Sequence, residues 1–389
     1  MFYIYFLIIA VFVVPNILLL GCKGSDGRKI EDTTKRVQNQ PKPKTDLSIE
    51  HNSSSEKLKF VIVENNGTSS KKDINLTMVP DKNISYSLVK EASFTDYGNI
   101  NTCTPLDENS NMICGFSNGL LFLKYLGEGS FEVEKKIRGL NYIEDIVSLE
   151  SKRSVLISNG YMGLERYDPF IKELSHIGTT ADGGWAGEIE VDQNRSYIAY
   201  GSQGVEIVNF DQNGSFVNDT NFDTSGYVQG IYLYSIKSML FLAKGYDGVE
   251  VLEIKDDTNI SSLSHISIEN EWVNGVSVEE SRELLFAGTD RSGILIYDIG
   301  DILKPKLIGT IESNTTLQKM ELKRNLLFAI KDKKSLEILD ISKIDDIRKV
   351  FGLDTGSYIN SVKYTPIDER VYISTQKGIF IYHLIKESL

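Results

Sequence analysis

The residues best suited to chemistry are three carboxylates, Glu144, Asp145 and Glu188, which lie two or three residues after the aromatic residues Tyr142 and Trp185. Carboxylates that approach one another can perform general acid–base catalysis or hold a cation. In a chain with 54 acidic residues, however, such groups are more commonly solvated charges. An enzyme, such as a lyase or hydrolase that uses these acidic residues and a divalent cation, is therefore the alternative hypothesis and not the first one.

Two common catalytic motifs are absent from the sequence. There is no phosphate-binding glycine loop and no His-Glu-x-x-His motif. The four histidines (His51, His176, His265 and His383) have no metal-ligand spacing. Asp211–Ser215 resembles a calcium loop only superficially, because the later glutamate is missing, and it is more typical of a hairpin turn. We predict no catalytic residues, no metal and no cofactor.

A binding surface is a stronger candidate, because an aromatic–polar–aliphatic pattern recurs along the chain. The aromatic members are Tyr142, Trp185, Tyr227, Trp272 and Tyr358. The polar members, two residues further on in each copy, include Asn101, Glu144, Gln229, Asn274, Gln318 and Asn360. In a strand, this spacing places all three types on one face. They could form a surface for a protein, peptide or glycan. Alternatively, the amides could link neighbouring repeats by hydrogen bonds while the aromatics pack between them.

The elements that position these residues are seven repeats. Arg291–Ser313 contains a glycine, an alternating apolar strand, a turn with proline and a second strand. Related strands begin at positions 119, 163, 204, 248, 293, 335 and 378, a period in the low forties. Four strands fit each repeat; in the fifth they are Trp272–Val278, Leu284–Thr289, Gly293–Tyr297 and Lys306–Thr310. Repeated four-stranded units that bury both faces on their neighbours predict an all-β, seven-bladed propeller, with a linear solenoid as the competitor.

The ends of the chain favour a closed ring. The last repeat stops after its third strand, Gly378–Leu384, and Ile84–Lys90 resembles the fourth strands of other repeats. We therefore expect the N-terminal strand to complete the C-terminal blade, which removes two free sheet edges. The first strand of the first repeat, Ile100–Pro105, then follows. The predicted propeller occupies residues 83–389 and is expected to be monomeric.

The glycine-led strand, the turn Asp298–Pro305 and the strand Lys306–Thr310 resemble the LVIVD-repeat proteins, which are extracytoplasmic propellers of bacteria and archaea. The resemblance spans about residues 83–384 and is sharpest in the fifth repeat. Ser335 replaces the leading glycine in the sixth. This resemblance implies a fold and no common activity.

The N-terminus predicts the location. Residues 1–21 form an uncharged apolar segment that ends in Leu19, Leu20 and Gly21 before Cys22, which resembles a bacterial lipobox. The resemblance implies signal-peptide cleavage and acylation (palmitate or a similar chain) of Cys22, and Lys23 at the next position weakly favours the outer membrane. The alternative is a retained transmembrane helix, since no Lys or Arg precedes the apolar run. Either way, the body lies outside the cytoplasm, on the periplasmic or the surface side.

Residues 22–82 are polar and mixed in charge, and predict a flexible tether. Two strand-like pieces within it, 58–63 and 74–79, could add to a sheet edge, bind a partner or cover one propeller face. Residues 83–389 hold 30 basic and 45 acidic side chains, which argues against nucleic acid as a ligand. We expect the partners to be the membrane, through the anchor, and another envelope or extracellular protein.

Cys103 and Cys114 occupy positions that are aliphatic in other repeats and should lie on neighbouring strands. In an oxidising compartment they could form a disulfide. Two buried core thiols are the alternative.

Overall fold

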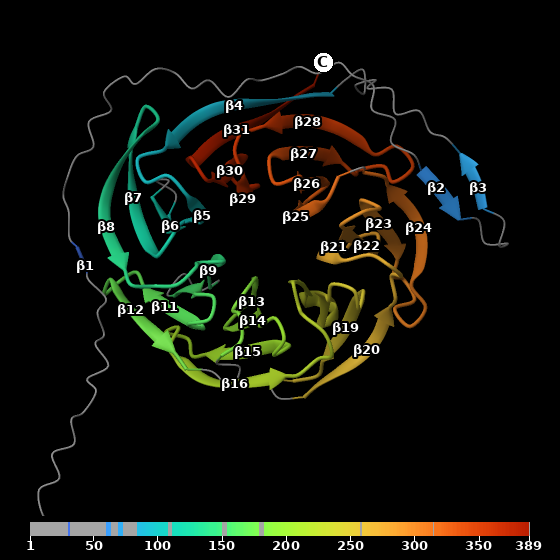
Figure 1. Ribbon diagram of the computed structural model, residues 1–389, viewed down its shortest axis with the longest axis horizontal. Helices are drawn as coiled ribbons and strands as arrows, with labels where there is room; N and C mark the ends of the chain where they lie inside the picture. Colours follow the sequence, from blue (N-terminus) through green and yellow to red (C-terminus); the bar gives the residue numbers. More distant parts are fainter. Residues whose placement is uncertain are drawn as a thin grey trace, which may run out of the picture.

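The computed structural model describes residues 30–31, 60–63, 69–72 and 84–388, apart from 108–110, 150–153, 179–182, 257–258 and 314. Its architecture is a ring of seven antiparallel sheets around a central axis (Figure 1). The predicted seven-bladed propeller is thereby confirmed. Within the described residues, the helical content is one short 3-10 turn, Ser235–Lys237.

Each blade contains four strands, counted from the axis outwards. Blade 1 consists of β5 (Ile100–Pro105), β6 (Met112–Phe116), β7 (Gly119–Gly127) and β8 (Ser130–Arg138). Blade 2 consists of β9 (Asp145–Ser148), β10 (Val155–Ser158), β11 (Leu164–Asp168) and β12 (Glu173–Ile177). Blade 3 consists of β13 (Ile189–Asp192), β14 (Arg195–Ala199), β15 (Val205–Phe210) and β16 (Phe216–Phe222). Blade 4 consists of β17 (Gly230–Tyr234), β18 (Met239–Ala243), β19 (Val249–Ile254) and β20 (Ile260–Ile266). Blade 5 consists of β21 (Val273–Glu279), β22 (Leu284–Thr289), β23 (Ile294–Asp298) and β24 (Lys306–Ile311). Blade 6 consists of β25 (Leu317–Lys323), β26 (Leu326–Lys331), β27 (Ser335–Asp340) and β28 (Arg348–Asp354). Blade 7 consists of β29 (Ile359–Thr365), β30 (Arg370–Thr375), β31 (Gly378–Ser388) and β4 (Ile84–Phe94).

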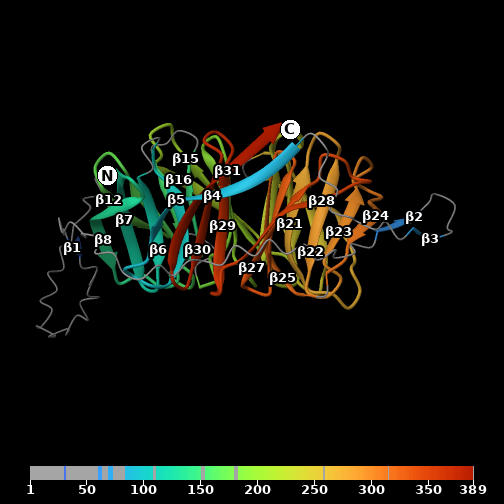
Figure 2. The same ribbon diagram turned by 90° about the horizontal axis from the view of Figure 1, so that it is seen from above.

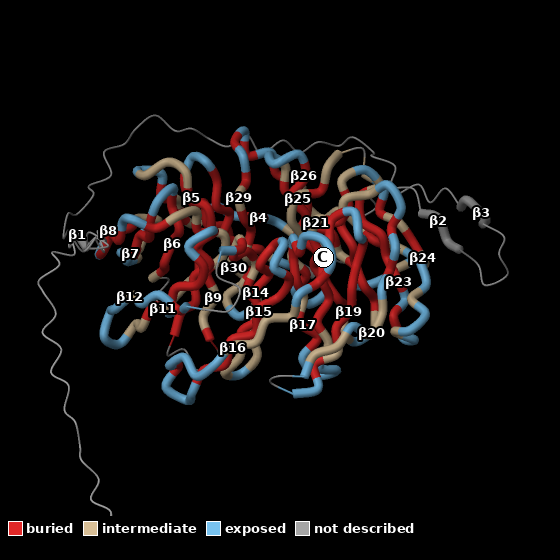
Figure 3. The backbone as a smooth tube through the Cα atoms, turned by 60° about the horizontal axis from the view of Figure 1, so that its bottom comes forward, coloured by how far each residue is buried: buried red, intermediate tan, exposed pale blue. Residues whose placement is uncertain are grey.

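The two middle strands of a blade are largely buried because each face packs on a neighbouring blade. In blade 5, β22 is buried along its whole length, whereas the outermost strand β24 has exposed residues at its start. Continuous apolar runs are typical of strands covered on both sides. The tube coloured by burial shows the same order, with buried strands and exposed connections (Figure 3).

Seven apolar cores hold the ring together, and each is shared by two adjacent blades. One contains Phe286 and Ile294 from blade 5 and Leu327 and Leu339 from blade 6. The same sharing continues around the circle, and one core joins blade 7 to blade 1. A blade alone would expose two apolar faces, so the burial that stabilises each blade requires both neighbours.

The ring closes through β4, as expected. β4 pairs antiparallel with β31 from Phe94 opposite Ile379 to Ile84 opposite Ser388. Leu88, Ala92 and Phe94 are buried in the cores on either side of blade 7. The first strand of the propeller therefore supplies the fourth strand of its last blade.

The glycine that leads most third strands is required by the backbone. At Gly248, φ is +78°, and a Cβ atom would lie 2.2 Å from the carbonyl oxygen of Ile266 on the adjacent outer strand. This combination excludes any side chain without rearrangement. In blade 6, where Ser335 takes the position, the left-handed residues are instead Asp332 and Lys333 in the preceding turn.

Antiparallel connectivity divides the loops between two faces. Connections from the second to the third strand, and from each outer strand to the next inner strand, lie on the face from which the inner strands start. The other connections lie on the opposite face. Both faces are seen edge-on in Figure 2. We call the first the entry face and the second the opposite face.

Three short strands precede the propeller. β1 (Ile30–Glu31) pairs with β8, and β2 (Phe60–Val63) pairs with β3 (Ser69–Lys72). The predicted piece 58–63 thus contains a strand, whereas 74–79 lies outside the described residues. Leu19, Leu20, Gly21 and Cys22 also lie outside them. Among the described residues, no helix has the length and hydrophobicity to cross a bilayer.

Cys103 and Cys114 are directly opposite each other on β5 and β6, with Cα atoms 4.1 Å apart, and are joined by a disulfide. Both are buried in the core between blades 7 and 1. The bond links the innermost strand of blade 1 to its neighbour.

Candidate functional site: the charged channel and the aromatic face

The inner strands surround a cavity of about 520 Å³ along the axis. All seven inner strands contribute to its wall. Eight of the lining side chains are charged, and they lie on or directly before β9, β13, β25 and β29. They are Glu144, Asp145, Glu188, Glu190, Lys319, Glu321, Lys323 and Lys363. We call this group the charged channel.

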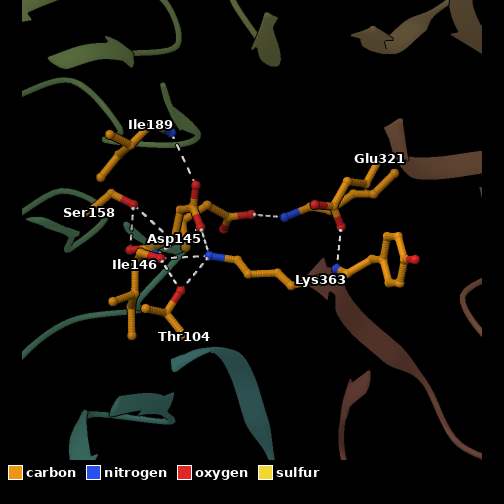
Figure 4. A network of polar contacts seen from close by, with 10 residues as sticks. Thr104, Asp145, Ile146, Ser158, Ile189, Glu321 and Lys363 are labelled. Carbon is orange, nitrogen blue, oxygen red and sulfur yellow. Dashed lines mark hydrogen bonds and ion pairs between the residues drawn. The ribbon is translucent and has the colours of Figure 1, made fainter. Parts of the chain in front are cut away.

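Two lysines cross the charged channel to blade 2. Lys319 Nζ lies 2.8 Å from Glu144 Oε1, which joins blade 6 to blade 2. Lys363 Nζ lies 2.9 Å from Asp145 Oδ1 and also donates to the carbonyl oxygen of Ile146 at 2.6 Å (Figure 4). Because these pairs connect strands that are not neighbours, they brace the ring across its centre.

The carboxylates also connect adjacent inner strands. Asp145 accepts a hydrogen bond from the backbone N–H of Ile189, and Glu188 accepts one from Ile231 N–H. Glu321, labelled in Figure 4, accepts one from the backbone N–H of Tyr364 at 3.0 Å. Each bond spans one repeat. Much of the charged channel therefore holds blades in register.

Burial and charge act in opposite directions on these groups. Burial raises the pKa of Glu188 to about 7 and that of Glu190 to about 8, although Lys319 and Lys323 oppose the rise. Burial likewise raises the pKa of Glu321 to about 7, against the effect of Lys323. For Asp145, burial is outweighed by Lys363, and its pKa is held below its ordinary value. Some channel carboxyls therefore hold a proton near neutral pH.

Lys319 is the counter-charge at the centre of this group. Burial opposes its positive charge, but Glu144 and then Glu188 hold its pKa above the ordinary lysine value. In the part of the chain that the structure describes, no group of three or more His, Cys, Asp or Glu side chains is arranged to hold a metal ion. Glu144, Asp145 and Glu188 bond instead to Lys319, Lys363 and the Ile231 N–H.

The predicted polar ring departs from the expected geometry. Of its six members, only Glu144 lines the cavity. The register of four inner strands shifts by one residue at the position of the polar side chain, which is Asn101, Asn274, Gln318 or Asn360. A β-bulge breaks the two-residue alternation, so the side chains beyond it point to the other face from that expected. The assumption of one continuous face was wrong in these strands.

Two of the four bulged amides link neighbouring blades. Asn274 Nδ2 donates to the carbonyl oxygen of Leu317 at 2.7 Å, and Asn360 Nδ2 donates to that of Ile100 at 2.7 Å. Asn101 is buried and accepts a hydrogen bond from Asn99. Gln318 is half-buried and Gln229 is exposed. These contacts fit the structural interpretation of the amides.

The five predicted aromatics lie on the entry face, outside the cavity. Trp185, Tyr227 and Trp272 cover Gly160, Gly201 and Gly245, which belong to loops of the preceding blades. At each of these three contacts, the backbone of the glycine also forms an antiparallel β-bridge with the residue that follows the aromatic one. Tyr358 is exposed and lies under the Lys334 ammonium group, 5.4 Å from its ring centre. Packing between blades thus explains why one side of the Trp185, Tyr227 and Trp272 rings is covered.

Two further tyrosines complete this surface, and the sequence pattern did not reveal them. Tyr161 contacts Trp185 edge-on at 4.9 Å, and Tyr246 contacts Trp272 edge-on at 5.0 Å. Their exposed fractions are 66% and 63%. Their signal was the repeated Gly-Tyr-x-Gly, Gly160–Gly163 and Gly245–Gly248. We call the surface made by Tyr142, Tyr161, Trp185, Tyr227, Tyr246, Trp272 and Tyr358 the aromatic face.

The aromatic face adjoins the charged channel near Glu144. Burial raises the pKa of Tyr142, and Glu144 raises it further. Burial, Tyr161 and Glu144 raise the pKa of Tyr227. Glu144 therefore acts electrostatically on both hydroxyl groups, and it also lines the charged channel.

Comparisons with known proteins support the fold and nothing finer. No family model and no curated protein matches the chain. Among solved structures, the crystal structure of the computationally designed Ika8 protein matches 76% of this chain and 99% of its own. The TM-score is 0.53 and the sequence identity is 10%. Such a likeness concerns the course of the chain in space and carries no activity.

Proposed function

We propose that this protein is a lipid-anchored, extracytoplasmic platform that binds another envelope or extracellular protein, without catalysing a reaction, through the aromatic face. The observation that carries the proposal is the pair of exposed tyrosines, Tyr161 and Tyr246, each held edge-on against a tryptophan. Ordered aromatic side chains present a large contact area at a low entropic cost, and Tyr and Trp dominate the energetics of protein interfaces.

The rigidity of the scaffold favours binding over a moving active site. Seven shared cores and the lysines across the charged channel fix the relative positions of the aromatic residues. A preorganised surface loses little conformational entropy when it binds.

Two features support the location outside the cytoplasm. The sequence Leu19-Leu20-Gly21-Cys22 resembles a lipobox, and several acyl chains on Cys22 would hold a soluble domain at a membrane. A disulfide between Cys103 and Cys114 is typical of an oxidising compartment. The repeat pattern resembles LVIVD proteins, and we assign the chain to that kind of propeller as part of this proposal.

The test is photo-crosslinking in intact cells. A photoreactive residue at position 161 or 246 should capture a protein that the same probe at Ile236, on the opposite face, does not capture. Tyr161→Ala with Tyr246→Ala should abolish recovery of that protein in a pull-down. Mass spectrometry of the N-terminal peptide tests the anchor. Absence of a captured protein at both aromatic positions would refute the binding role, and an unacylated Cys22 would refute the anchor.

A second candidate function is catalysis in the charged channel, favoured by the raised pKa values of Glu188, Glu190 and Glu321. Carboxyls protonated near neutral pH can serve as general acids, and such shifts concentrate at active sites. Metal analysis of the purified protein separates the two functions, since a stoichiometric divalent ion that is lost in Glu188→Gln would favour an enzyme.

A further inference from the structure

Three lysines gather at one end of the aromatic face. Lys333 and Lys334 lie in the turn between β26 and β27 of blade 6, and Lys377 lies in the turn between β30 and β31 of blade 7. All three are exposed. At the corresponding turns of blades 1 to 4, no lysine or arginine is exposed. We call Lys333, Lys334 and Lys377 the lysine arc.

One loop, residues 355–358, connects blade 6 to blade 7 and holds the two lysine turns together. The carbonyl oxygen of Lys334 accepts hydrogen bonds from the backbone N–H and from the hydroxyl group of Thr355. On the other side of the loop, Lys377 Nζ donates to the carbonyl oxygen of Gly356 at 3.2 Å. The lysine arc is therefore a fixed part of the junction between these blades.

The positive charge of the lysine arc has no carboxylate partner in the part of the chain that the structure describes. Lys331 and Lys349, nearby in blade 6, share the carboxylate of Glu337 instead. Asp332 and Asp354 lie in or beside the lysine turns, but neither forms an ion pair with the lysine arc. Three lysines and two aspartates leave this part of the entry face with a net charge of +1.

The neighbouring part of the entry face is acidic. The loops of blades 3 to 5 carry carboxylates that are exposed or half-buried: Asp223, Asp247, Glu269, Glu271, Asp290 and Glu312. Arg291, the exposed cation of these loops, lies 3.8 Å from Asp290. The entry face is thus positive at blades 6 and 7 and negative at blades 3 to 5. Such a division attracts a charged group of a partner to one end and repels it from the other.

We propose that the partner of the aromatic face is a protein that presents an acidic segment to the lysine arc. The proposal rests on the proposed function, and it adds the chemistry of the partner and the rotation in which it docks. Carboxylates at the lysine arc would form charge-assisted hydrogen bonds with the ammonium groups. The same segment turned toward blades 3 to 5 would meet like charge. Tyr358, whose ring centre lies 5.4 Å from Lys334 Nζ, joins this charged contact to the aromatic contact.

The first experiment maps the contact directly. It uses the full acylated chain and the protein captured by the photoreactive residue at position 246. A carbodiimide joins a lysine amine to a carboxylate that touches it. We expect mass spectrometry to find at least one residue of the lysine arc linked to an aspartate or glutamate of the partner. Lys333→Arg with Lys334→Arg and Lys377→Arg should keep the affinity and lose these links, because the charge remains but the amine is gone.

Charge reversal measures the contribution of the lysine arc. Lys333→Glu with Lys334→Glu and Lys377→Glu should weaken binding by about 10- to 100-fold at low salt, and the loss should shrink as the ionic strength rises. The matched control reverses three exposed lysines of the opposite face and makes the same change in net charge; it is Lys304→Glu with Lys306→Glu and Lys343→Glu. Binding by this control should be nearly unchanged.

The outcomes separate this proposal from the proposed function. Undiminished binding by the Lys333→Glu, Lys334→Glu, Lys377→Glu variant, or links confined to lysines outside the lysine arc, would overturn the acidic partner and leave the binding role intact. Tighter binding by that variant would also overturn it, because it would indicate a basic partner on the carboxylates of blades 3 to 5. Capture of no protein at positions 161 and 246 would refute the binding role itself, and the acidic partner with it.

Discussion

Lys319 shows how a single residue joins structure and chemistry in this protein. It lies on β25 and pairs with Glu144, directly before β9 and three blades away around the ring, and its charge also acts on Glu188. The alternation along β25 places Lys319, Glu321 and Lys323 in the channel wall. Lys319 thus interacts with charges of two other blades, so the effects of substituting it should be larger than its partial exposure suggests.

We expect Lys319→Met to lower the free energy of unfolding by about 1–2 kcal/mol, because Glu144 and Glu188 would lose their shared counter-charge in an enclosed cavity. The side chains of the Lys319–Glu144 pair are 28% and 21% exposed. Urea unfolding at pH 8 measures the change. The control is Lys172→Met, whose pair with Glu134 is 62% and 52% exposed and should be worth less than about 0.5 kcal/mol. Equal losses in the two variants would contradict the brace.

The channel carboxyls predict a pH dependence of stability. Burial raises the pKa of Glu190 to about 8, above its unfolded value near 4.5. Between these values the folded state binds more protons than the unfolded state, so stability falls as pH rises. We expect Glu190→Gln to leave stability almost unchanged at pH 5 and to increase it by about 1–3 kcal/mol at pH 9. Urea unfolding at pH 5, 7 and 9 tests this expectation, with the exposed Glu312→Gln as control. A pH-independent difference would show that charge is not the cause.

At the scale of the strand, the repeated glycine limits what each blade accepts. Gly248→Ala would place a Cβ 2.2 Å from the Ile266 carbonyl oxygen at φ +78°. Gly127 has a similar φ, +86°, but its Cβ would meet nothing within 4 Å. We expect Gly248→Ala to cost at least about 2 kcal/mol and Gly127→Ala about 1 kcal/mol, since both carry the left-handed strain and only the first carries the clash. Thermal unfolding compares them. A larger loss of stability in Gly127→Ala than in Gly248→Ala would refute the role given to the steric clash at Gly248.

The disulfide makes a second prediction at this scale. Replacing Cys103 and Cys114 by alanine should cost about 3 kcal/mol, through the lost loop constraint in the unfolded chain and two small cavities. Denaturant unfolding of the oxidised protein, the reduced protein and the double variant provides the measurement. Reduction without alanine substitution is the control, because it removes the bond and retains the sulfur atoms. If reduction leaves the midpoint unchanged, the bond does not stabilise blade 1.

The strands themselves could largely be predicted from sequence, whereas the channel could not. In blade 5, the predicted strands agree with β21 to β24 within one residue at each end, because apolar alternation and the glycine recur in every repeat. The inner strands depart from alternation at bulges such as Asn274 and Gln318, and nothing local in the sequence signals them. The sequence therefore indicated only the channel residues of blades 2 and 3. The channel residues of blades 6 and 7, which are Lys319, Glu321 and Lys363, come near Glu144 and Asp145 only once the ring has closed.

At the scale of the whole molecule, stability depends on closure. Phe94 lies on β4 and is buried in the core between blades 7 and 1. We expect Phe94→Ala to cost about 3–4 kcal/mol, because it removes apolar burial at the junction that completes the ring. The matched control on the same strand is Val89→Ala, half of whose side chain is exposed and which should change stability by less than about 0.5 kcal/mol.

Hydrogen exchange tests the cooperative part of this expectation. Opening the junction in Phe94→Ala should speed exchange of β4, β31 and β5 together, because the strands share that core. Faster exchange confined to β4 would indicate a loosely attached strand and not a structural closure.

The pairing of β4 with β31 determines when the ring can close during biosynthesis. β4 is synthesised before the rest of the propeller and must wait, without its partner, until β31 has been synthesised. A nascent chain that stops early can stack several blades, yet it leaves an unpaired margin at both of its extremities, and such margins recruit other chains or proteases. The circle therefore cannot close before β31 has been synthesised, and a product that terminates before β31 is marked for disposal by its own open end.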